Sequence, residues 1–296
     1  MHFLLFSNVN KDPDQKVTER LERLILERGH AVTKVLEGDE APEEGIPLDT
    51  LAPIDVVIVL GGDGTMLRAS HAIGAGEVPM IGLNLGTTGF LTEVECSAME
   101  DMVDRLIRGE YEVEERMMLT GRIRKEGQES EAPVSFSALN DVVIIREGVL
   151  RLIALRIYVN DVFFDTYEAD GVIISTPTGS TGYNLSAGGP IVSPKTRAIV
   201  LTPISPHSLS KKSIVFDAGD RIRITLTEKR KTQVNEGIVS FDGYKNYEIS
   251  VGDQVEVMSS SVPLRLIRLE QRSFFEVISR KLDRPAVQQE ISNEER

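Results

Sequence analysis

The chain has 296 residues, of which 41% are hydrophobic and 27% charged, as in ordinary soluble globular proteins. Its formal net charge of -13 disfavours nucleic acid and anionic membranes as partners, although local backbone amides can still bind a small phosphate ligand. Cys96 is the only cysteine, which excludes an intrachain disulfide and a cysteine zinc site. The apolar runs are strand-sized and no targeting segment is recognised, so we expect a cytoplasmic protein.

The first third of the chain alternates predicted strands and helices. Apolar residues from Val17 to Ile25 recur at helical spacing, and Gly29 ends this helix. Residues 55–60 (Asp-Val-Val-Ile-Val-Leu) are continuously apolar after Asp55, which is typical of a strand buried on both faces of a parallel sheet. Residues 37–53 are acidic and proline-rich and predict an exposed loop. Other strands are predicted over 2–7, 31–36 and 78–83, and other helices from about Met66 and from Ser97 to Gly109. The pattern predicts a βαβ-type domain with a parallel sheet.

The pattern changes after about residue 118, where short strands separated by turn signals replace the helices. This second region is predicted to be all-β, a sandwich or layered sheet. Helical spacing returns over 273–282, and the last dozen residues are polar and expected to fray. The predicted strands are 119–125, 133–146, 151–158, 162–166, 171–176, 197–202, 219–227, 233–240 and 253–258.

A glycine cluster, Gly61-Gly62-Asp63-Gly64-Thr65, lies between a predicted buried strand and a predicted helix. Glycines let backbone N–H groups approach a ligand closely, and a helix N-terminus adds partial positive charge, so the pattern indicates a phosphate-binding loop. It matches neither a Walker A loop nor the Gly-x-Gly-x-x-Gly dinucleotide fingerprint. Asp63 would repel phosphate unless it binds a metal or accepts a proton from an attacking hydroxyl. The competing interpretation is that Asp63 only caps the helix.

Three further stretches carry groups suited to a nucleotide. Residues 84–91 again follow a strand, although alone they indicate only a tight turn. Residues 170–190 run from a buried strand into a loop rich in glycines and hydroxyls, which suits a sugar–phosphate ligand, and Tyr183 could stack on a base. Asn140 and Asp141 could grip the two hydroxyls of a ribose, although such a pair is more often a turn.

These four stretches occur in the order and spacing of NAD kinases, which the chain resembles over about residues 3–282. The Gly-Gly-Asp-Gly element alone also resembles diacylglycerol and sphingosine kinases and, more distantly, phosphofructokinases; the segment 170–190 decides between them. The resemblance implies an α/β fold in which the last segment returns to the first domain. The expected divisions are a Rossmann-like parallel-sheet domain over 1–118, an all-β domain over 119–262, a returning strand and helix over 263–284, and a disordered tail over 285–296.

The resemblance also implies a role for each matching residue. Asp63 would be the general base that accepts the proton of the adenosine-ribose 2′-hydroxyl of NAD. Asn140 and Asp141 would hold ribose hydroxyls, and the charge of Asp170 would suit the cationic nicotinamide ring. No residue is expected to hold a metal. The other residues expected to contact NAD or ATP are Gly64, Arg68, Arg151, Glu168, Thr181, Gly182, Tyr183, Asn184, Leu185 and Ser186.

Several positions depart from the family pattern. Asp141 stands where bacterial members more often have Glu, Glu168 where many have Lys or Arg, and Tyr244 where Gln is common. Residues 211–213 (Lys-Lys-Ser) stand where an Arg-Pro pair is expected. These departures concern substrate preference rather than the class of reaction.

The reaction that the resemblance implies is transfer of the γ-phosphoryl group of ATP to NAD, giving NADP, with a divalent metal, Mg²⁺, delivered by ATP. NAD and ATP are the expected partners, and a homodimer or homotetramer built through the β domain is expected. One alternative is a lipid or sugar kinase of the same superfamily, the lipid case being disfavoured by the acidic charge. The other is a non-catalytic dinucleotide sensor, which the intact Asp63 disfavours.

Overall fold

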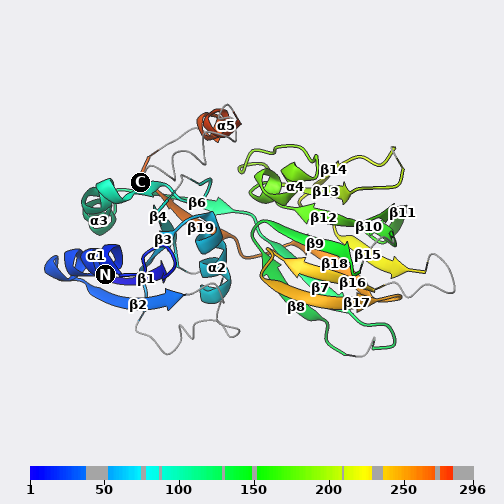
Figure 1. Ribbon diagram of the computed structural model, residues 1–296, viewed down its shortest axis with the longest axis horizontal. Helices are drawn as coiled ribbons and strands as arrows, with labels where there is room; N and C mark the ends of the chain where they lie inside the picture. Colours follow the sequence, from blue (N-terminus) through cyan, green and yellow to red (C-terminus); the bar gives the residue numbers. More distant parts are fainter. Residues whose placement is uncertain are drawn as a thin grey trace.

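The computed structural model describes residues 1–37, 53–74, 78–86, 89–128, 131–148, 152–208, 210–228, 236–270 and 274–282. The chain forms two domains that lie side by side, an α/β domain and a β domain (Figure 1). Most of the loop expected over 37–53, the tail expected over 285–296 and Arg151 lie outside these residues. Among the described helices, none is long and apolar enough to cross a membrane.

The first domain is a sheet with helices on both faces, as predicted. Within the described residues the sheet has the order β2-β1-β3-β4-β19-β6, and β5 pairs with β4. The strands β1 to β5 run parallel to one another, β19 runs parallel to β4, and β6 is antiparallel to β19. The elements are β1 (His2–Asn8), α1 (Lys16–Glu27), β2 (Ala31–Glu37), β3 (Val56–Gly61), α2 (Asp63–Ile73), β4 (Met80–Asn84), β5 (Val94–Glu95), η2 (Cys96–Ala98), α3 (Met99–Arg108), β6 (Glu112–Arg116) and β19 (Leu264–Arg268).

Alternating residues of β3 face two separate hydrophobic clusters. Ile58 and Leu60 pack on one face with residues of α1 and α3, and Val57 and Val59 pack on the other with α2. The apolar residues from Val56 to Leu60 therefore belong to a strand that is buried on both faces, as expected. Helix α2 begins at Asp63, directly after the extended Gly62, which is three residues earlier than the apolar spacing predicts. The first turn has few apolar side chains, so the apolar pattern does not mark where the helix begins.

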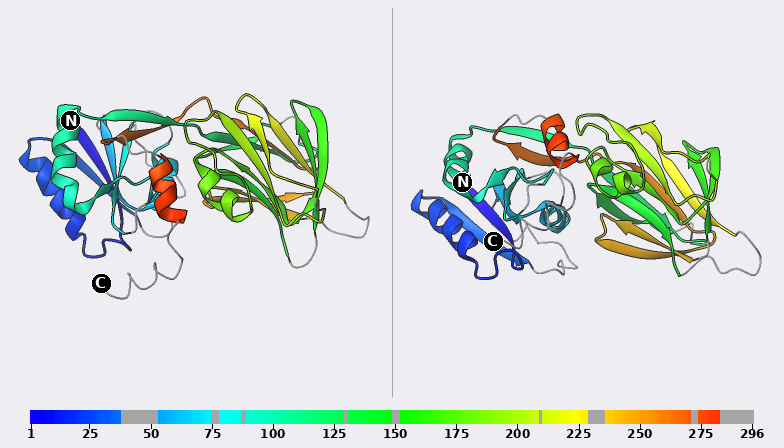
Figure 2. Two further views of the ribbon diagram at one scale, coloured as in Figure 1. Left: turned by 90° about the horizontal axis from the view of Figure 1, so that it is seen from above. Right: turned by 45° about the horizontal axis from the view of Figure 1, so that its top comes forward.

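The second domain is a sandwich of two antiparallel sheets whose inner faces share one hydrophobic core (Figure 2). In the part of the chain that the structure describes, one sheet has the order β11-β10-β15-β18-β7-β8 and the other β14-β13-β12-β9-β16-β17. The elements are β7 (Leu119–Arg124), β8 (Val134–Ala138), β9 (Asp141–Arg146), β10 (Ile153–Val159), β11 (Val162–Ala169), β12 (Gly171–Ser175), η3 (Gly179–Thr181), α4 (Tyr183–Ser186), β13 (Ala198–Ile204), β14 (Ile214–Asp217), β15 (Ile222–Thr227), β16 (Glu236–Phe241), β17 (Lys245–Ser250) and β18 (Gln254–Ser259).

Two differences from the predicted strands have physical causes. The single strand predicted over 133–146 is wrong: β8 and β9 belong to different sheets, and the chain crosses between the sheets at Leu139 and Asn140. Strands β6, β14 and β17 are absent from the prediction. All three are edge strands with half-exposed side chains, so their sequences lack a strong apolar pattern.

The chain passes from the first domain to the second between β6 and β7 and returns between β18 and β19. Strand β19 then inserts between β4 and β6, which confirms that the C-terminal segment returns to the first domain. Helix α5 (Phe274–Leu282) lies on the side of the first domain that faces the second (Figure 2). The segments that follow β3 and β4 lie close to the β domain, since Met66 and Leu91 share a hydrophobic cluster with Leu139.

Candidate functional site

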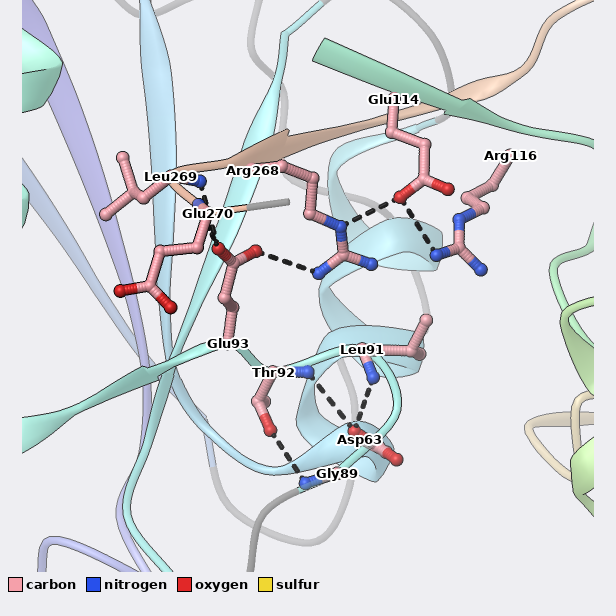
Figure 3. Close-up of polar contacts among 10 residues, drawn as sticks. All are labelled: Asp63, Gly89, Leu91, Thr92, Glu93, Glu114, Arg116, Arg268, Leu269 and Glu270. Carbon is pink, nitrogen blue, oxygen red and sulfur yellow. Dashed lines mark hydrogen bonds and ion pairs between the residues drawn. The ribbon is translucent and has the colours of Figure 1, made fainter. Parts of the chain in front are cut away.

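The Asp63 carboxylate is fixed by backbone groups of the second glycine-rich stretch. Its Oδ2 accepts a hydrogen bond from Phe90 N at 2.7 Å, and its Oδ1 accepts from Leu91 N at 3.0 Å and Thr92 N at 3.3 Å (Figure 3 shows the two bonds to Oδ1). A Cβ at Gly89 would overlap the carboxylate, so the close approach requires glycine there. The loops that follow β3 and β4 therefore interlock through Asp63.

Lys11, which no sequence pattern indicated as a site residue, lies over the first glycine-rich loop. A Cβ built at Gly62 would be 2.8 Å from Lys11 Nζ, and one built at Gly86 would be 3.8 Å from it. Lys11 is exposed, and it has no ion pair within the described part of the chain. A solvated ammonium thus stands beside the N-terminus of α2, where backbone N–H groups already favour an anion.

Gly64 and Arg68 occupy the first two turns of α2 and differ in what they offer a ligand. Gly64 is exposed. The guanidinium of Arg68 is turned toward the buried Glu37, with 3.3 Å between Arg68 Nε and Glu37 Oε2. Burial raises the pKa of Glu37, and the charge of Arg68 opposes that rise. The positive charge of Arg68 is therefore largely balanced inside the protein.

Asn140 and Asp141 lie where the chain changes sheets, against the loop that follows β12. Asn140 O accepts a hydrogen bond from Thr176 N at 2.8 Å, and Gly179 packs directly on the Asn140 backbone. The Asn140 side chain faces Gly182, whose Cβ would lie 3.9 Å from Asn140 Nδ2. Asp141 is only 6% exposed, and its burial, with the nearby charge of Asp242, raises its pKa to about 7.

Thr181 is the last residue of the 3-10 helix η3, and Tyr183–Ser186 form the short helix α4. Tyr183 and Ser186 are exposed, whereas Thr181, Gly182 and Leu185 are half-buried. Asn184 is completely buried: its amide donates to Ser180 O and Pro190 O, both at 3.0 Å, and its Oδ1 accepts from Thr202 Oγ1 at 2.7 Å. Asn184 thus holds the loop in shape, and its completely buried side chain is not exposed to a ligand.

Glu168 and Asp170 lie apart from the other predicted site residues. They precede β12, whereas the loop beginning at Thr176 follows it, so the length of this strand, about 17 Å, separates the two groups. Asp170 Oδ1 is 2.6 Å from Arg146 Nε in an ion pair. Within one copy of the chain, therefore, Asn140 and Asp141 lie against the loop that follows β12, and Leu91, from the loop that holds Asp63, shares a hydrophobic cluster with Leu139. Glu168 and Asp170 lie at the other end of β12.

A cavity of about 610 Å³ opens between the two domains beside this cluster. Its walls come from the 89–93 loop, β6, the 178–181 and 193–195 segments, and α5. Gly89, Phe90 and Thr181 link the cavity to the groups described above. The volume lies in the range typical of small-molecule and cofactor sites.

The cavity wall contains a charged network that joins three elements of the first domain (Figure 3). Arg268 on β19 donates to Glu93 Oε2 at 3.1 Å and to Glu114 Oε2 at 2.8 Å, and Arg116 Nη2 donates to the same Glu114 oxygen at 3.0 Å. Burial would raise the pKa of Glu114, but the two guanidinium groups outweigh it and hold that pKa below its usual value. Burial also lowers the pKa of Arg116.

This network has a consequence for Asp63. Glu93 also accepts from Leu269 N and Glu270 N, at 3.0 and 2.9 Å, which ties the end of the 89–93 loop to the returning strand (Figure 3). The same loop supplies the N–H groups that hold Asp63. Neither Glu93 nor Arg268 was predicted as a site residue, because their partners are far apart in the sequence.

Among the described residues, no group of three or more His, Cys, Asp or Glu side chains is arranged to hold a metal ion.

Comparisons with known proteins agree over nearly the whole chain. The models of the ATP-NAD kinase N-terminal and C-terminal domains match residues 48–111 and 139–269. The NAD kinase of Lachnoclostridium phytofermentans is 42% identical over 283 residues, which cover 94% of this chain and 98% of that protein. The NAD kinase of Agathobacter rectalis is 40% identical over 287 residues, covering 95% and 98%.

Two solved structures share the fold. Yeast NADH kinase complexed with NADH has a TM-score of 0.84 at 24% identity and covers 97% of this chain and 88% of that one. An NAD kinase from Archaeoglobus fulgidus in complex with ATP has a TM-score of 0.70 at 24% identity, covering 92% and 95%. The two domain models and the relatives above 30% identity, which span both domains, decide the assignment: the chain is an enzyme that belongs to the NAD kinase family.

Proposed function

We propose that this enzyme transfers the γ-phosphoryl group of ATP to the adenosine-ribose 2′-hydroxyl of NAD, giving NADP, with Asp63 as general base. The observation that carries the proposal is the Asp63 carboxylate itself, which backbone N–H groups orient at a helix N-terminus beside two glycine-rich loops. Two solved relatives, one complexed with NADH and one with ATP, support the same pair of ligands.

The proton-accepting role of Asp63 is compatible with its hydrogen bonds. Among described residues, Oδ1 accepts two bonds and Oδ2 accepts only the one from Phe90 N. A carboxylate oxygen has two lone-pair directions, so Oδ2 retains one for the proton of an attacking hydroxyl. The N–H donors hold the carboxylate in one orientation, and such positioning is what base catalysis requires before chemistry begins.

The remaining groups divide between the two substrates. Asn140 and Asp141 would hold ribose hydroxyls of NAD, and Thr181, Tyr183 and Ser186 would surround its adenosine, with the backbone from Gly182 to Leu185 between them. Lys11 and the amides at the N-terminus of α2 would bind ATP phosphates, because a free ammonium and helix-terminal N–H groups both favour anions. Gly64, being exposed in the first turn, leaves room for a phosphate there.

Mg²⁺ would enter with ATP. The ligands of this ion would be mainly phosphate oxygens and water. When bound, the ion would offset the negative charge that ATP and Asp63 bring together. The chain's own contribution is to orient the two substrates.

A homodimer or homotetramer built through the β domain is part of the proposal. Val162, Phe163 and Phe164 on the edge strand β11 are 70, 54 and 39% exposed, which is unusual for large apolar side chains at a free sheet edge. Glu168 and Asp170, which lie far from Asp63 in their own chain, would then contribute to the site of a neighbouring subunit. A cytoplasmic location remains a prediction, which cell fractionation tests.

The direct experiment is to incubate the purified chain with ATP, Mg²⁺ and NAD and to measure NADP; no NADP formation would overturn the proposed reaction. The base is tested by Asp63→Asn, which should lower kcat by about 10²–10⁴-fold and leave NAD affinity nearly unchanged in calorimetry. If Asp63 only anchors the 89–92 loop, NAD affinity should fall together with kcat. An Asn variant that keeps more than about half of kcat would exclude Asp63 as the base.

A further inference from the structure

A second carboxylate, Asp242, organises the loop that carries Asn140 and Asp141. Its Oδ1 accepts hydrogen bonds from Asn140 N at 2.7 Å and Asp141 N at 2.9 Å. Its Oδ2 accepts from Leu139 N at 2.7 Å and from His71 Nε2 at 2.8 Å. The side chain of Asp242 is completely buried, and these four donors occupy all the lone-pair directions of its two oxygens.

The sheet crossing explains why three consecutive N–H groups need this acceptor. Strand β8 pairs in one sheet and β9 in the other, so the backbone between them leaves one hydrogen-bond ladder before it joins the next. Buried backbone N–H groups are costly without partners. The carbonyl groups on the other side of the loop are also bonded: Leu139 O accepts from Thr176 Oγ1 at 2.6 Å. The loop is thus held from both sides.

The hairpin between β16 and β17 presents Asp242 to this loop and also contacts the first domain at His71. Asp242 and Gly243 have φ values of 53° and 70°, the left-handed conformation typical of a tight Asp-Gly hairpin turn. Tyr244, the next residue, stacks on the His71 ring with 4.9 Å between centroids and 25° between planes. His71 lies in the last turn of α2, two turns beyond Asp63 on the same helix.

We infer that the hairpin tip Asp242–Tyr244 is a positioning device, which holds the Asn140–Asp141 loop and clamps it through His71 to the helix that begins with Asp63. This inference rests on the proposed function, since it assigns the clamp to the placing of NAD against Asp63. One carboxylate bonds both the ribose-binding loop and α2, so the two halves of the site share a rigid connection across the domain boundary. The same device gives a role to Tyr244, which departs from the family pattern and whose ring stacks on His71.

The clamp matters because the reacting oxygen must meet both Asp63 and the γ-phosphate. A displacement of about 1 Å in such a site can lower the rate about 10²-fold. Asp242 acts on the NAD side, because it bonds the backbone of Asn140 and Asp141. His71 acts on the α2 side, because it joins that backbone anchor to the helix of Asp63. The two residues should therefore affect different kinetic constants.

Asp242→Asn supplies one acceptor oxygen where there are two and directs an amide N–H₂ at the loop. It should raise the KM for NAD at least about 10-fold and leave the KM for ATP unchanged. Asp253→Asn is the matched control. Asp253 is a buried turn carboxylate that accepts from Ser250 N, Glu126 N and Lys125 Nζ, each at 2.9 Å, in a turn that does not touch the site. It should lower Tm without changing either KM.

His71 offers a pair of variants that separates the hydrogen bond from the ring stack. His71→Phe keeps the ring on Tyr244 but removes the donor, and it should lower kcat about 10-fold or more with little change in NAD affinity. His71→Gln keeps a donor near the position of Nε2 and should retain most of kcat. This pair also decides the matter if Asp242→Asn does not fold, because only a role in the clamp predicts that Gln is better than Phe.

Amide hydrogen exchange provides a readout that does not depend on the reaction. In the substrate-free full chain, His71→Phe should speed exchange in peptides that contain Leu139 to Asp141, and Asp253→Asn should not. Equal kcat for the two His71 variants with unchanged exchange in that segment would overturn the clamp, as would an Asp242→Asn variant that behaves like the Asp253 control. Failure of the wild-type chain to form NADP would instead overturn the proposed function, and the exchange data would still report on the clamp.

Discussion

Asp141 allows a quantitative test of the electrostatics of the Asn140–Asp141 loop. Its side chain is almost fully buried, and burial together with the neighbouring Asp242 raises its pKa from 3.8 to about 7. The unfolded chain releases this proton near pH 3.8, whereas the folded chain keeps it until about pH 7. Asp141→Asn replaces the titrating group with a neutral side chain of the same size, so it should remove this pH dependence.

The sign and size of the pH dependence that Asp141 gives to the free energy of unfolding follow from proton linkage. Below pH 3.8 both states bind the proton, and Asp141 imposes no pH-dependent cost. Between 3.8 and 7 the unfolded state binds fewer protons than the folded state, so stability falls by up to about 1.4 kcal/mol for each pH unit. Above pH 7 Asp141 is ionised in both states, and the loss in the free energy of unfolding that its ionisation causes is constant, at most about 4 kcal/mol. The wild-type chain should thus lose stability as pH rises toward 7.

Urea unfolding of both proteins between pH 5.5 and 8.5 measures this effect. The free energy of unfolding of Asp141→Asn minus that of the wild type should increase by about 2 kcal/mol from pH 5.5 to 7 and then stay level. Asp253→Asn is again the control: burial would raise the pKa of Asp253, but hydrogen bonds from Ser250 N and Lys125 outweigh burial and lower it. Its stability difference should be flat over this range. A flat difference for Asp141→Asn as well would refute the reasoning.

Three other substitutions test separate parts of the site. Gly89→Ala places a Cβ on the Asp63 carboxylate and should lower kcat about 10²-fold at nearly unchanged Tm; steady-state kinetics with wild-type activity would contradict the interlocked loops. Lys11→Gln removes the ammonium beside Gly62 and should raise the KM for ATP about 10-fold but not the KM for NAD; an unchanged KM for ATP would exclude the phosphate contact. Phe164→Glu charges the exposed β11 edge and should lower the mass seen by light scattering, whereas an unchanged oligomer would locate the contact elsewhere.

Local patterns in the sequence were sufficient where one segment alone decides its own structure. The continuous apolar run of β3 indicates burial on both faces, and the helical spacing in α1 indicates one buried stripe. The Gly-Gly-Asp-Gly loop identifies Asp63 because glycine, a carboxylate and a following helix are adjacent in the chain. The family resemblance extended this to the order of the domains and to the return of the last segment, which forms β19.

Tertiary structure decided everything that depends on partners distant in sequence. The predicted strand 133–146 reads as continuous because apolar residues occur on both sides of Asn140; only sheet packing shows that the chain changes sheets there. The edge strands β6, β14 and β17 lack an apolar signal because solvent covers part of each. Asn184 resembles a ligand residue in the motif, yet burial directs its amide into the loop.

The same reason applies to the groups that hold the site in place. His71 and Asp242 are 171 residues apart, and Arg268 and Glu93 are 175 apart. No periodicity or spacing connects such residues, because a hydrogen bond depends on position in space and not on separation along the chain. Local sequence patterns therefore indicated which residues are candidates for the chemistry, and the packing of the two domains determined which residues orient them.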